Sequence, residues 1–381
     1  MQILGILAFI AALLLSVMIH ELGHYLTAKR FGMKVSEFFL GFGTRIWSRQ
    51  RGETEFGLKA IPAGGYCKIE GMSPGDPMPE GEQERAFYKA SSGRKLIVLS
   101  AGSFLHFVIG YVLLFTLFAG IGTTQALPII AEVVKDSAAQ SAGIMVGDEI
   151  TSINGKEVSD WYNDVLVIRN SSGRELTLGI VRNAQDLIIK ATPRVMSIDG
   201  EKRYLLGIIN ESGLRRTGVF ASLKNAAIVT KEFLVQSVKA LVNLPSKIPQ
   251  LWGQTVAGQE RDSNGLVGIV GVARVSGQAV SSQNLTVMER VATFLLIIAS
   301  LNIFVGLFNL LPILPLDGGH MAVAIADEIR AFIARLRGRA RPAAIDVRVL
   351  APITMVVFVI LVALTLLLLV ADIVNPIVLN L

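Results

Sequence analysis

The sequence predicts a polytopic α-helical membrane protein with four transmembrane helices, a cytoplasmic-side membrane-associated β-hairpin and an inserted α+β domain. Of its 381 residues, 52% are hydrophobic, and the mean hydropathy of +0.55 is far above that of a soluble domain of this size. Four apolar runs are long enough to cross about 30 Å of hydrocarbon. These runs are Ile3–Ile19, which continues into the polar residues after it, Ile97–Ile121, Val291–Leu316 and Val349–Val370.

The first apolar run ends in His20-Glu21-Leu22-Gly23-His24. A helix turns about 100° per residue, so His20 and His24 lie about 40° apart on one face, where two imidazoles can share a small cation. Glu21 projects off the edge of that face, close enough to touch a water on the metal without being a ligand, as in the H-E-x-x-H pattern of zinc metalloproteases. Ionisable residues are costly inside a membrane helix and are functional candidates by default. The alternative is that His20, Glu21 and His24 simply lie at the water-exposed end of the helix and bind no metal.

Positive charge is concentrated in two segments. Lys29–Lys95 contains twelve Lys or Arg and Arg330–Arg348 contains six Arg, whereas the N-terminus and the C-terminal tail have almost none. Because positive loops stay in the cytoplasm, we expect the N-terminus and Gly122–Arg290 to be extracytoplasmic, in a cell inner or plasma membrane. A cleavable signal peptide is not expected, since no basic stretch precedes the first run and no A-x-A-like site follows it.

The composition also argues against two classes of protein. The net charge of +6 comes without aromatic interleaving or a compact basic domain, so nucleic acid is not an expected partner. The single cysteine, Cys67, excludes an internal disulfide and is more typical of a small packed residue than of a nucleophile.

The loop after the first run predicts extended structure. Ser36–Trp47 and Thr54–Ile61 are rich in aromatic and aliphatic residues and predict a β-hairpin, and Tyr66–Glu70 is expected as a third short extended piece. Ser73–Glu84 is rich in Pro, Gly and acidic residues and is typical of a mobile linker. The strands form either a soluble three-stranded patch or an open edge that receives an unwound substrate strand by β-augmentation.

Residues Pro128–Pro193 are the one stretch that looks like a soluble domain. Asn154-Gly155 between two apolar stretches is the strongest short signal for a hairpin turn. The expected elements are a strand at Ile129–Val134, a helix at Ser137–Gly143, a strand at Glu149–Asn154, a helix at Trp161–Arg169, and strands at Leu176–Arg182 and Asp186–Thr192.

Three further segments carry weaker signals. Val219–Trp252 mixes apolar residues with lysines and predicts an amphipathic helix on the outer membrane surface. Gly253–Gln283 is rich in Gly and Ser and is expected to be a loop, and the fourth apolar run is expected to have only a packing role. His106, in the second run, is more typical of a hydrogen-bonded packing residue than of a metal ligand, because nothing at helical spacing around it would complete a site.

The third apolar run carries a second group of polar residues. It contains Asn309 and meets Pro312 and Pro315, which should end or kink the helix, and Asp317 follows directly. Membranes tolerate irregular backbone only where it faces protein or water, so this carboxylate is expected to point inward. The charge pattern places Asp317 and the His20/His24 turn toward the cytoplasmic ends of their helices, at one depth. The alternatives are that Asp317 only caps a helix or that His320, three residues on, is the ligand.

Taken together, these motifs resemble the site-2 protease family of intramembrane zinc metalloproteases over essentially the full length. The resemblance rests on H-E-L-G-H at His20–His24, on N-x-x-P-x-x-P-L-D-G at Asn309–Gly318, and on G-L-V-G-I at Gly265–Ile269, where the family often has G-P-V-G-I. The soluble-looking stretch resembles a PDZ domain. The segment from Phe42-Gly43 to Gly71-Met72 resembles actinobacterial members, and one PDZ domain rather than two separates the chain from the best-known enterobacterial branch. The second run departs from the usual A-G-P-x-x-N, with Ala101-Gly102-Ser103-Phe104-Leu105-His106 in its place.

The resemblance implies a zinc endopeptidase that cleaves within the transmembrane segment of single-pass proteins. It implies Zn²⁺ held by His20, His24 and Asp317, with Glu21 as general base and Asn309 contacting the substrate backbone. The implied substrates are proteins already shortened outside the membrane by a site-1 protease, commonly anti-sigma factors, as in regulated intramembrane proteolysis. The PDZ-like domain is expected either to bind peptide termini, through backbone N–H groups near Ile144–Gly147, or to act as a size filter.

Two other classes of protein would also keep polar residues in membrane helices. A transporter could relay protons through them, but it would not require metalloprotease spacing or a peptide-binding-like domain. A scaffold could present the PDZ-like domain beside a dead site.

The expected domain organisation follows from these assignments. It comprises a first transmembrane helix with the zinc motif at 1–30, the hairpin or re-entrant loop and linker at 31–93, a second transmembrane helix at 94–122, the PDZ-like domain at 123–215, an extracytoplasmic amphipathic helix and loop at 216–289, a third transmembrane helix at 290–318, a cytoplasmic basic loop at 319–348 and a fourth transmembrane helix at 349–374.

Overall fold

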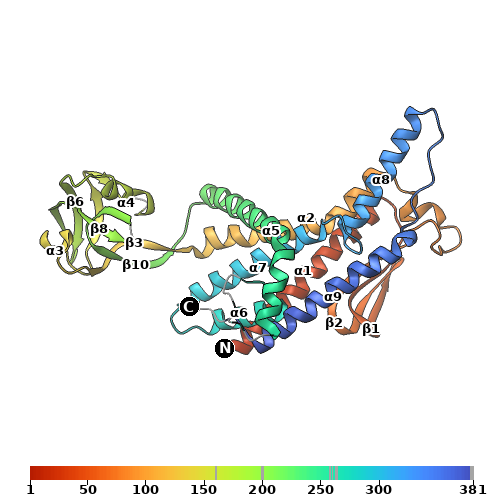
Figure 1. The fold of residues 1–381 in the computed structure, drawn as a ribbon, viewed down its shortest axis with the longest axis horizontal. Helices are drawn as coiled ribbons and strands as arrows, with labels where there is room; N and C mark the ends of the chain where they lie inside the picture. Colours follow the sequence, from red (N-terminus) through yellow and green to blue (C-terminus); the bar gives the residue numbers. More distant parts are fainter. Residues whose placement is uncertain (159–160, 199–200, 257–258, 260, 262–264, 378–381) are drawn as a thin grey trace. The chain divides into compact units, whose positions relative to one another are not determined.

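The computed structural model describes residues 1–158, 161–198, 201–256, 259, 261 and 265–377. It divides into two compact units, one formed by 1–120 and 217–381 and the other by 121–216. The first unit contains four helices long and apolar enough to cross a membrane (Figure 1). They are α1 (Gln2–Arg30), α2 (Ser92–Thr116, continued by the π-helical turn Leu117–Ile121), α7 (Val287–Asn309) and α9 (Ala351–Val374, preceded by the 3-10 turn Val347–Leu350). Each of the four predicted runs therefore forms such a helix, although the third helix ends at Asn309 and not at Leu316.

Two long strands follow α1, namely β1 (Val35–Arg51) and β2 (Thr54–Ile69). The third extended piece expected from the sequence belongs to β2. Phe38 of β1 pairs with both Phe56 and Cys67 of β2, so the two ends of β2 lie on opposite sides of the first half of β1. Two short 3-10 turns, Gln83–Arg85 and Phe87–Lys89, lead on to α2.

Charged side chains tie the turn of this hairpin to the rest of the unit. Arg85 donates two hydrogen bonds of 2.7 Å to the carboxylate of Glu53, and Lys29 at the end of α1 also pairs with Glu53. The hydrogen bonds from Arg85, followed by those from Lys29, lower the pKa of Glu53 to about 2 against the opposing effect of burial. The hairpin is thus anchored at the end of the helix that carries the histidines.

The segment after α7 contains a helix that the sequence analysis missed. Residues 319–348 were expected to be a basic loop, but α8 extends over Asp317–Leu336. Its exposed apolar side chains Ile325, Ile329 and Phe332 recur at helical spacing between charged residues. This periodicity indicates a helix, but the prediction of a loop gave more weight to the many arginines in the segment.

The stretch expected to be a loop at Gly253–Gln283 contains α6 (Ile269–Ser281), so that prediction is wrong for this part. Small residues in α6 are buried against α1, where Gly5 and Gly277 leave no room for a Cβ atom. Small residues allow helix backbones in membranes to approach closely, and a single sequence shows the same composition in loops. The predicted helix after residue 219 is present as the long helix α5 (Val219–Val256), which packs against α2, α7 and α9.

Just beyond the fourth apolar run, α9 carries a buried charge that contributes to helix packing. Asp372 near the end of α9 is 1% exposed and forms a 2.9 Å ion pair with Arg261, which is equally buried. The same carboxylate accepts a 2.7 Å hydrogen bond from the Gly271 N–H in the first turn of α6. Asp372 therefore joins α9 to the start of α6.

The second unit is an α+β domain built on an antiparallel sheet of order β10-β3-β4-β6-β7, with β5 beside β4 and a separate β8–β9 hairpin. Its core includes Ile130, Ile150 and Leu178. The three strands β8, β9 and β10 extend beyond the predicted elements. The elements are β3 (Thr123–Val133), α3 (Ala138–Ser141), β4 (Glu149–Ile153), β5 (Lys156–Glu157), α4 (Trp161–Arg169), β6 (Leu176–Arg182), β7 (Gln185–Ala191), β8 (Arg194–Ile198), β9 (Glu201–Leu205) and β10 (Ile208–Arg215).

The loop that was expected to receive a peptide terminus already uses most of its donors. The N–H groups of Ile144, Met145 and Gly147 donate to Ala139 O, to the Asp148 carboxylate and to Ile130 O, at 3.0, 2.8 and 2.8 Å. Three of the four N–H groups of Ile144–Gly147 are therefore occupied within the domain, and this loop is not an open site for a carboxylate.

Candidate metal centre

Two histidines on α1 face the interior of the first unit. His20 and His24 are each 7% exposed and lie one turn apart, as the sequence predicted. Between them, Gly23 packs directly against the backbone of α2, because a Cβ atom there would lie 2.7 Å from the carbonyl oxygen of Ala101. Glycine thus permits the close approach that places this turn of α1 against α2.

The carboxylate comes from the turn that connects α7 to α8. The helix α7 ends at Asn309, and Asp317 is the first residue of α8. The prolines between them deny backbone donors and interrupt the helix. Gly318 and Gly319 are buried against the backbone of residues 310–314, where a side chain would clash. This compact turn directs Asp317 back toward α1.

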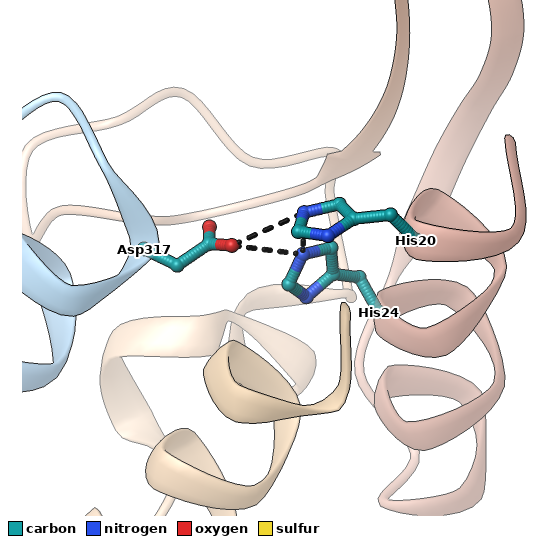
Figure 2. A group of neighbouring side chains, drawn as sticks. All are labelled: His20, His24 and Asp317. Carbon is teal, nitrogen blue, oxygen red and sulfur yellow. Dashed lines mark hydrogen bonds and ion pairs between the residues drawn. The ribbon is translucent and has the colours of Figure 1, made fainter. Parts of the chain in front are cut away.

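The three side chains meet in space (Figure 2). The two Nε2 atoms of His20 and His24 are 3.0 Å apart, and they lie 3.2 and 3.3 Å from Oδ2 of Asp317. Ligand atoms on a tetrahedral zinc ion with bonds of 2.0–2.1 Å are about 3.3 Å apart. The spacing of this nitrogen–nitrogen–oxygen set therefore fits zinc closely.

A hydrogen bond from Nδ1 of His24 leaves the Nε2 atom of this residue available to bind a metal ion. Its Nδ1 donates to the carbonyl oxygen of Val98 on α2 at 2.8 Å. A neutral imidazole that carries its proton on Nδ1 presents a bare lone pair on Nε2, which is the form that binds a metal. The Nε2 lone pair of His24 and the neighbouring carboxylate oxygen of Asp317 are therefore both available as ligands for a divalent cation.

Glu21 lies beside this cluster and outside it. Its carboxylate interacts electrostatically with His20, His24 and Asp317, and the backbone of Cys67 on β2, a strand that packs against α1, lies close to it. The hairpin therefore reaches the glutamate at the centre of the H-E-x-x-H motif. The sequence did not predict this contact. The pairing of β1 with β2 that places Cys67 beside α1 contains several register shifts, which no local pattern indicates.

Gly102 on α2 is a site residue that the sequence analysis missed. A Cβ atom on it would lie 2.5 Å from Cε1 of His20 and 2.6 Å from Nε2 of His24. Both imidazoles therefore occupy the space that a side chain at this position would take. The available signal was the A-G pair of the second apolar run, which the sequence analysis used only to compare this run with the family pattern.

Other polar residues singled out in the sequence lie near the cluster but do not join it. His106 is buried and hydrogen-bonded to Asn302 on α7 at 2.9 Å, as expected for a packing residue. Among the described residues, the candidate cluster comprises only His20, His24 and Asp317, so it does not include His320. His320 lines a small cavity with Lys95 and Asp327. Asn309 is partly buried at the C-terminal end of α7.

Two histidines on a membrane-length helix and a carboxylate at the start of α8, with a glutamate beside them, form an arrangement typical of a metallohydrolase in a membrane protein. The profile of Peptidase family M50 matches residues 8–361, and the chain belongs to this family. It is 33% identical to the zinc metalloprotease Rip1 of Mycobacterium tuberculosis and to that of Mycobacterium bovis, over 99% of both chains in each case. It is 32% identical to Rip1 of Mycolicibacterium smegmatis over 98% of both chains. The protein is therefore a site-2 protease family zinc metalloprotease.

Proposed function

We propose that His20, His24 and Asp317 hold the catalytic zinc ion and that Glu21 is the general base. The observation that carries this proposal is that three ligand atoms from helices about three hundred residues apart in the sequence lie within 4.8 Å of one another. Zinc held there would supply a Lewis acid for the scissile carbonyl and for the attacking water. The carboxylate of Glu21 would accept a proton from the attacking water and pass it to the leaving amine.

The proposed substrate is a peptide bond within the transmembrane segment of a single-pass membrane protein. His20 and His24 lie on the membrane-length helix α1, and Asp317 follows shortly after the membrane-length helix α7, which supports presentation of the substrate within the membrane. Peptide bonds in an intact helix are sheltered by their own hydrogen bonds, so the substrate unwinds locally. The outer edge of β2 and Asn309 are the proposed holders of the opened backbone, and the proximity of Cys67 on β2 to Glu21 supports the first of these roles.

Anti-sigma factors already cleaved outside the membrane by a site-1 protease are the proposed physiological substrates. The charge pattern of the sequence supports an orientation with the N-terminus and residues 121–216 outside the cytoplasm and the cluster toward the cytoplasmic side. In this arrangement the α+β unit acts as a PDZ-like size filter that excludes substrates with intact external domains. The occupied N–H groups at Ile144–Gly147 favour this role over capture of a peptide terminus.

The test is Glu21→Gln in the full-length protein, purified in detergent with a reporter transmembrane peptide. The variant is expected to keep its zinc, measured by elemental analysis, and to lose at least about 10²–10⁴-fold in cleavage rate, as expected for removal of a general base. Glu132→Gln, on an exposed position of β3, is the matched control and should cleave normally. Normal turnover by Glu21→Gln would refute the assigned base.

A second experiment identifies substrates and separates the alternatives. Cells that carry Glu21→Gln should accumulate membrane proteins as truncated stubs, and comparative proteomics would identify them. A transporter predicts proton flux without stubs, and a scaffold predicts no change in either measurement.

A further inference from the structure

One ring nitrogen of His20 is buried without a hydrogen-bond partner among the described residues. This atom is Nδ1, because Nε2 faces His24 and Asp317. Metal-binding histidines almost always donate their second ring N–H to an acceptor, which fixes the tautomer and the ring orientation. His24 satisfies this rule through the carbonyl oxygen of Val98, so His20 is the ligand whose support is incomplete.

The imidazole of His106 lies directly beside that of His20. Their ring centroids are 5.0 Å apart and their planes are tilted by 44°. Two imidazoles joined by an N–H···N bond of about 2.9 Å have their centroids about 5 Å apart. A small rotation of either ring would therefore bring a nitrogen of each within bonding distance, and His106 is 2% exposed, so bulk water does not compete.

Asn302 determines which nitrogen of His106 is available. The amide N–H of Asn302 donates to the carbonyl oxygen of Ile298 at 2.8 Å, which orients its Oδ1 toward Nδ1 of His106 at 2.9 Å. An amide oxygen only accepts, so His106 donates from Nδ1. The neutral ring then has a bare lone pair on Nε2, which makes that atom an acceptor.

We propose that Nε2 of His106 accepts the hydrogen bond from Nδ1 of His20, so that His106 and Asn302 are positioning residues for the zinc ligand. This inference rests on the proposed zinc site. It makes one polar chain across three membrane helices, from Asn302 on α7 through His106 on α2 to His20 on α1. A competing acceptor is Ser103, whose hydroxyl is also buried and has no hydrogen-bond partner in the described part of the chain.

The test compares variants that remove or retain an acceptor in the full-length protein. His106→Leu removes the acceptor, whereas His106→Asn retains a side-chain oxygen, and Ser103→Ala is the matched control on the same helix. Zinc affinity is measured by competition with a chelator, and the visible spectrum of the Co²⁺-substituted protein reports on the geometry of the ligands. His106→Leu should weaken zinc binding about 10–100-fold and change the Co²⁺ spectrum. His106→Asn and Ser103→Ala should remain close to the wild type.

Three outcomes would overturn the proposal. Wild-type affinity in His106→Leu would show that His20 needs no acceptor there, and equal losses in the Leu and Asn variants would show a packing role only. A loss in Ser103→Ala alone would give the role to Ser103. If His106→Leu does not fold, Asn302→Leu replaces it, because freeing Nδ1 of His106 allows the proton to move to Nε2, and a loss in the same direction is expected.

His20→Ala in the same assay separates this inference from the proposed function. If His20→Ala keeps its zinc, the metal centre itself is misassigned and both proposals fail. If His20→Ala loses zinc while His106→Leu binds it normally, only the positioning role fails.

Discussion

Replacing Gly102 with alanine should disable the metal centre while leaving the fold intact. The added Cβ atom would lie 2.5 Å from Cε1 of His20 and 2.6 Å from Nε2 of His24, whereas carbon atoms pack at about 3.5–4.0 Å. Both rings must therefore move by about 1 Å, which is several times the tolerance of about 0.2 Å on zinc–ligand distances. A displacement of about 1 Å in a catalytic group can reduce the rate by about 10²-fold.

The assay measures zinc content and cleavage of the reporter peptide in Gly102→Ala, with Gly93→Ala as the control. Gly93 is also on α2, but a Cβ atom there meets nothing within 4 Å. The Gly102 variant should lose most of its zinc and at least about 10²-fold of its activity, because both ligands move together. The Gly93 variant should match the wild type. Normal zinc affinity in Gly102→Ala would refute the close packing of α2 on the two histidines.

Asp317→Asn should lower the bound zinc far more than His320→Ala, because only the former changes an atom of the cluster; elemental analysis measures both, and the reverse ranking would give the role to His320. Arg261→Leu should lower the free energy of unfolding in detergent by about 3–5 kcal/mol, because it leaves the buried Asp372 carboxylate without its cation. Adding Asp372→Asn should recover part of that loss, and a double variant no more stable than the single one would contradict the argument. Because the pKa of Glu53 is lowered from an ordinary value of 4.5 to about 2, its stabilisation is complete above the ordinary value and is lost as the pH falls between these two values. Hydrogen exchange at the hairpin turn should rise over that interval in the wild type, and an equal rise in Glu53→Gln would assign it to another group.

The sequence predicted the local elements that carry the candidate cluster, because each is encoded by nearby residues. The spacing of His20 and His24 fixes their common face on a helix, and the prolines before Asp317 fix the end of α7. Their meeting at one depth followed from the distribution of positive charge. The meeting itself depends on tertiary packing, and the sequence left both Asp317 and His320 open as the third ligand.

The wrong predictions concern segments whose amino-acid composition is found in both loops and packed helices. The glycines and serines of α6 were interpreted as a loop, although Gly277 is needed for the contact with α1. The arginine-rich segment that forms α8 was likewise predicted to be a loop, because of its composition. The ion pair between Arg261 and Asp372 joins residues 111 positions apart, and no local pattern indicates such a partner.

Glycine explains how polar chemistry is accommodated in these apolar helices. Gly23 and Gly102 let α1 and α2 approach until the histidines of one helix fill the space left by the other, and Gly318 does the same for the turn that carries Asp317. Close backbone approach excludes lipid and water, which strengthens every hydrogen bond inside and makes an unsatisfied buried polar atom costly. The free Nδ1 of His20 is therefore the atom at which this packing predicts one more interaction, and the imidazole of His106 is beside it.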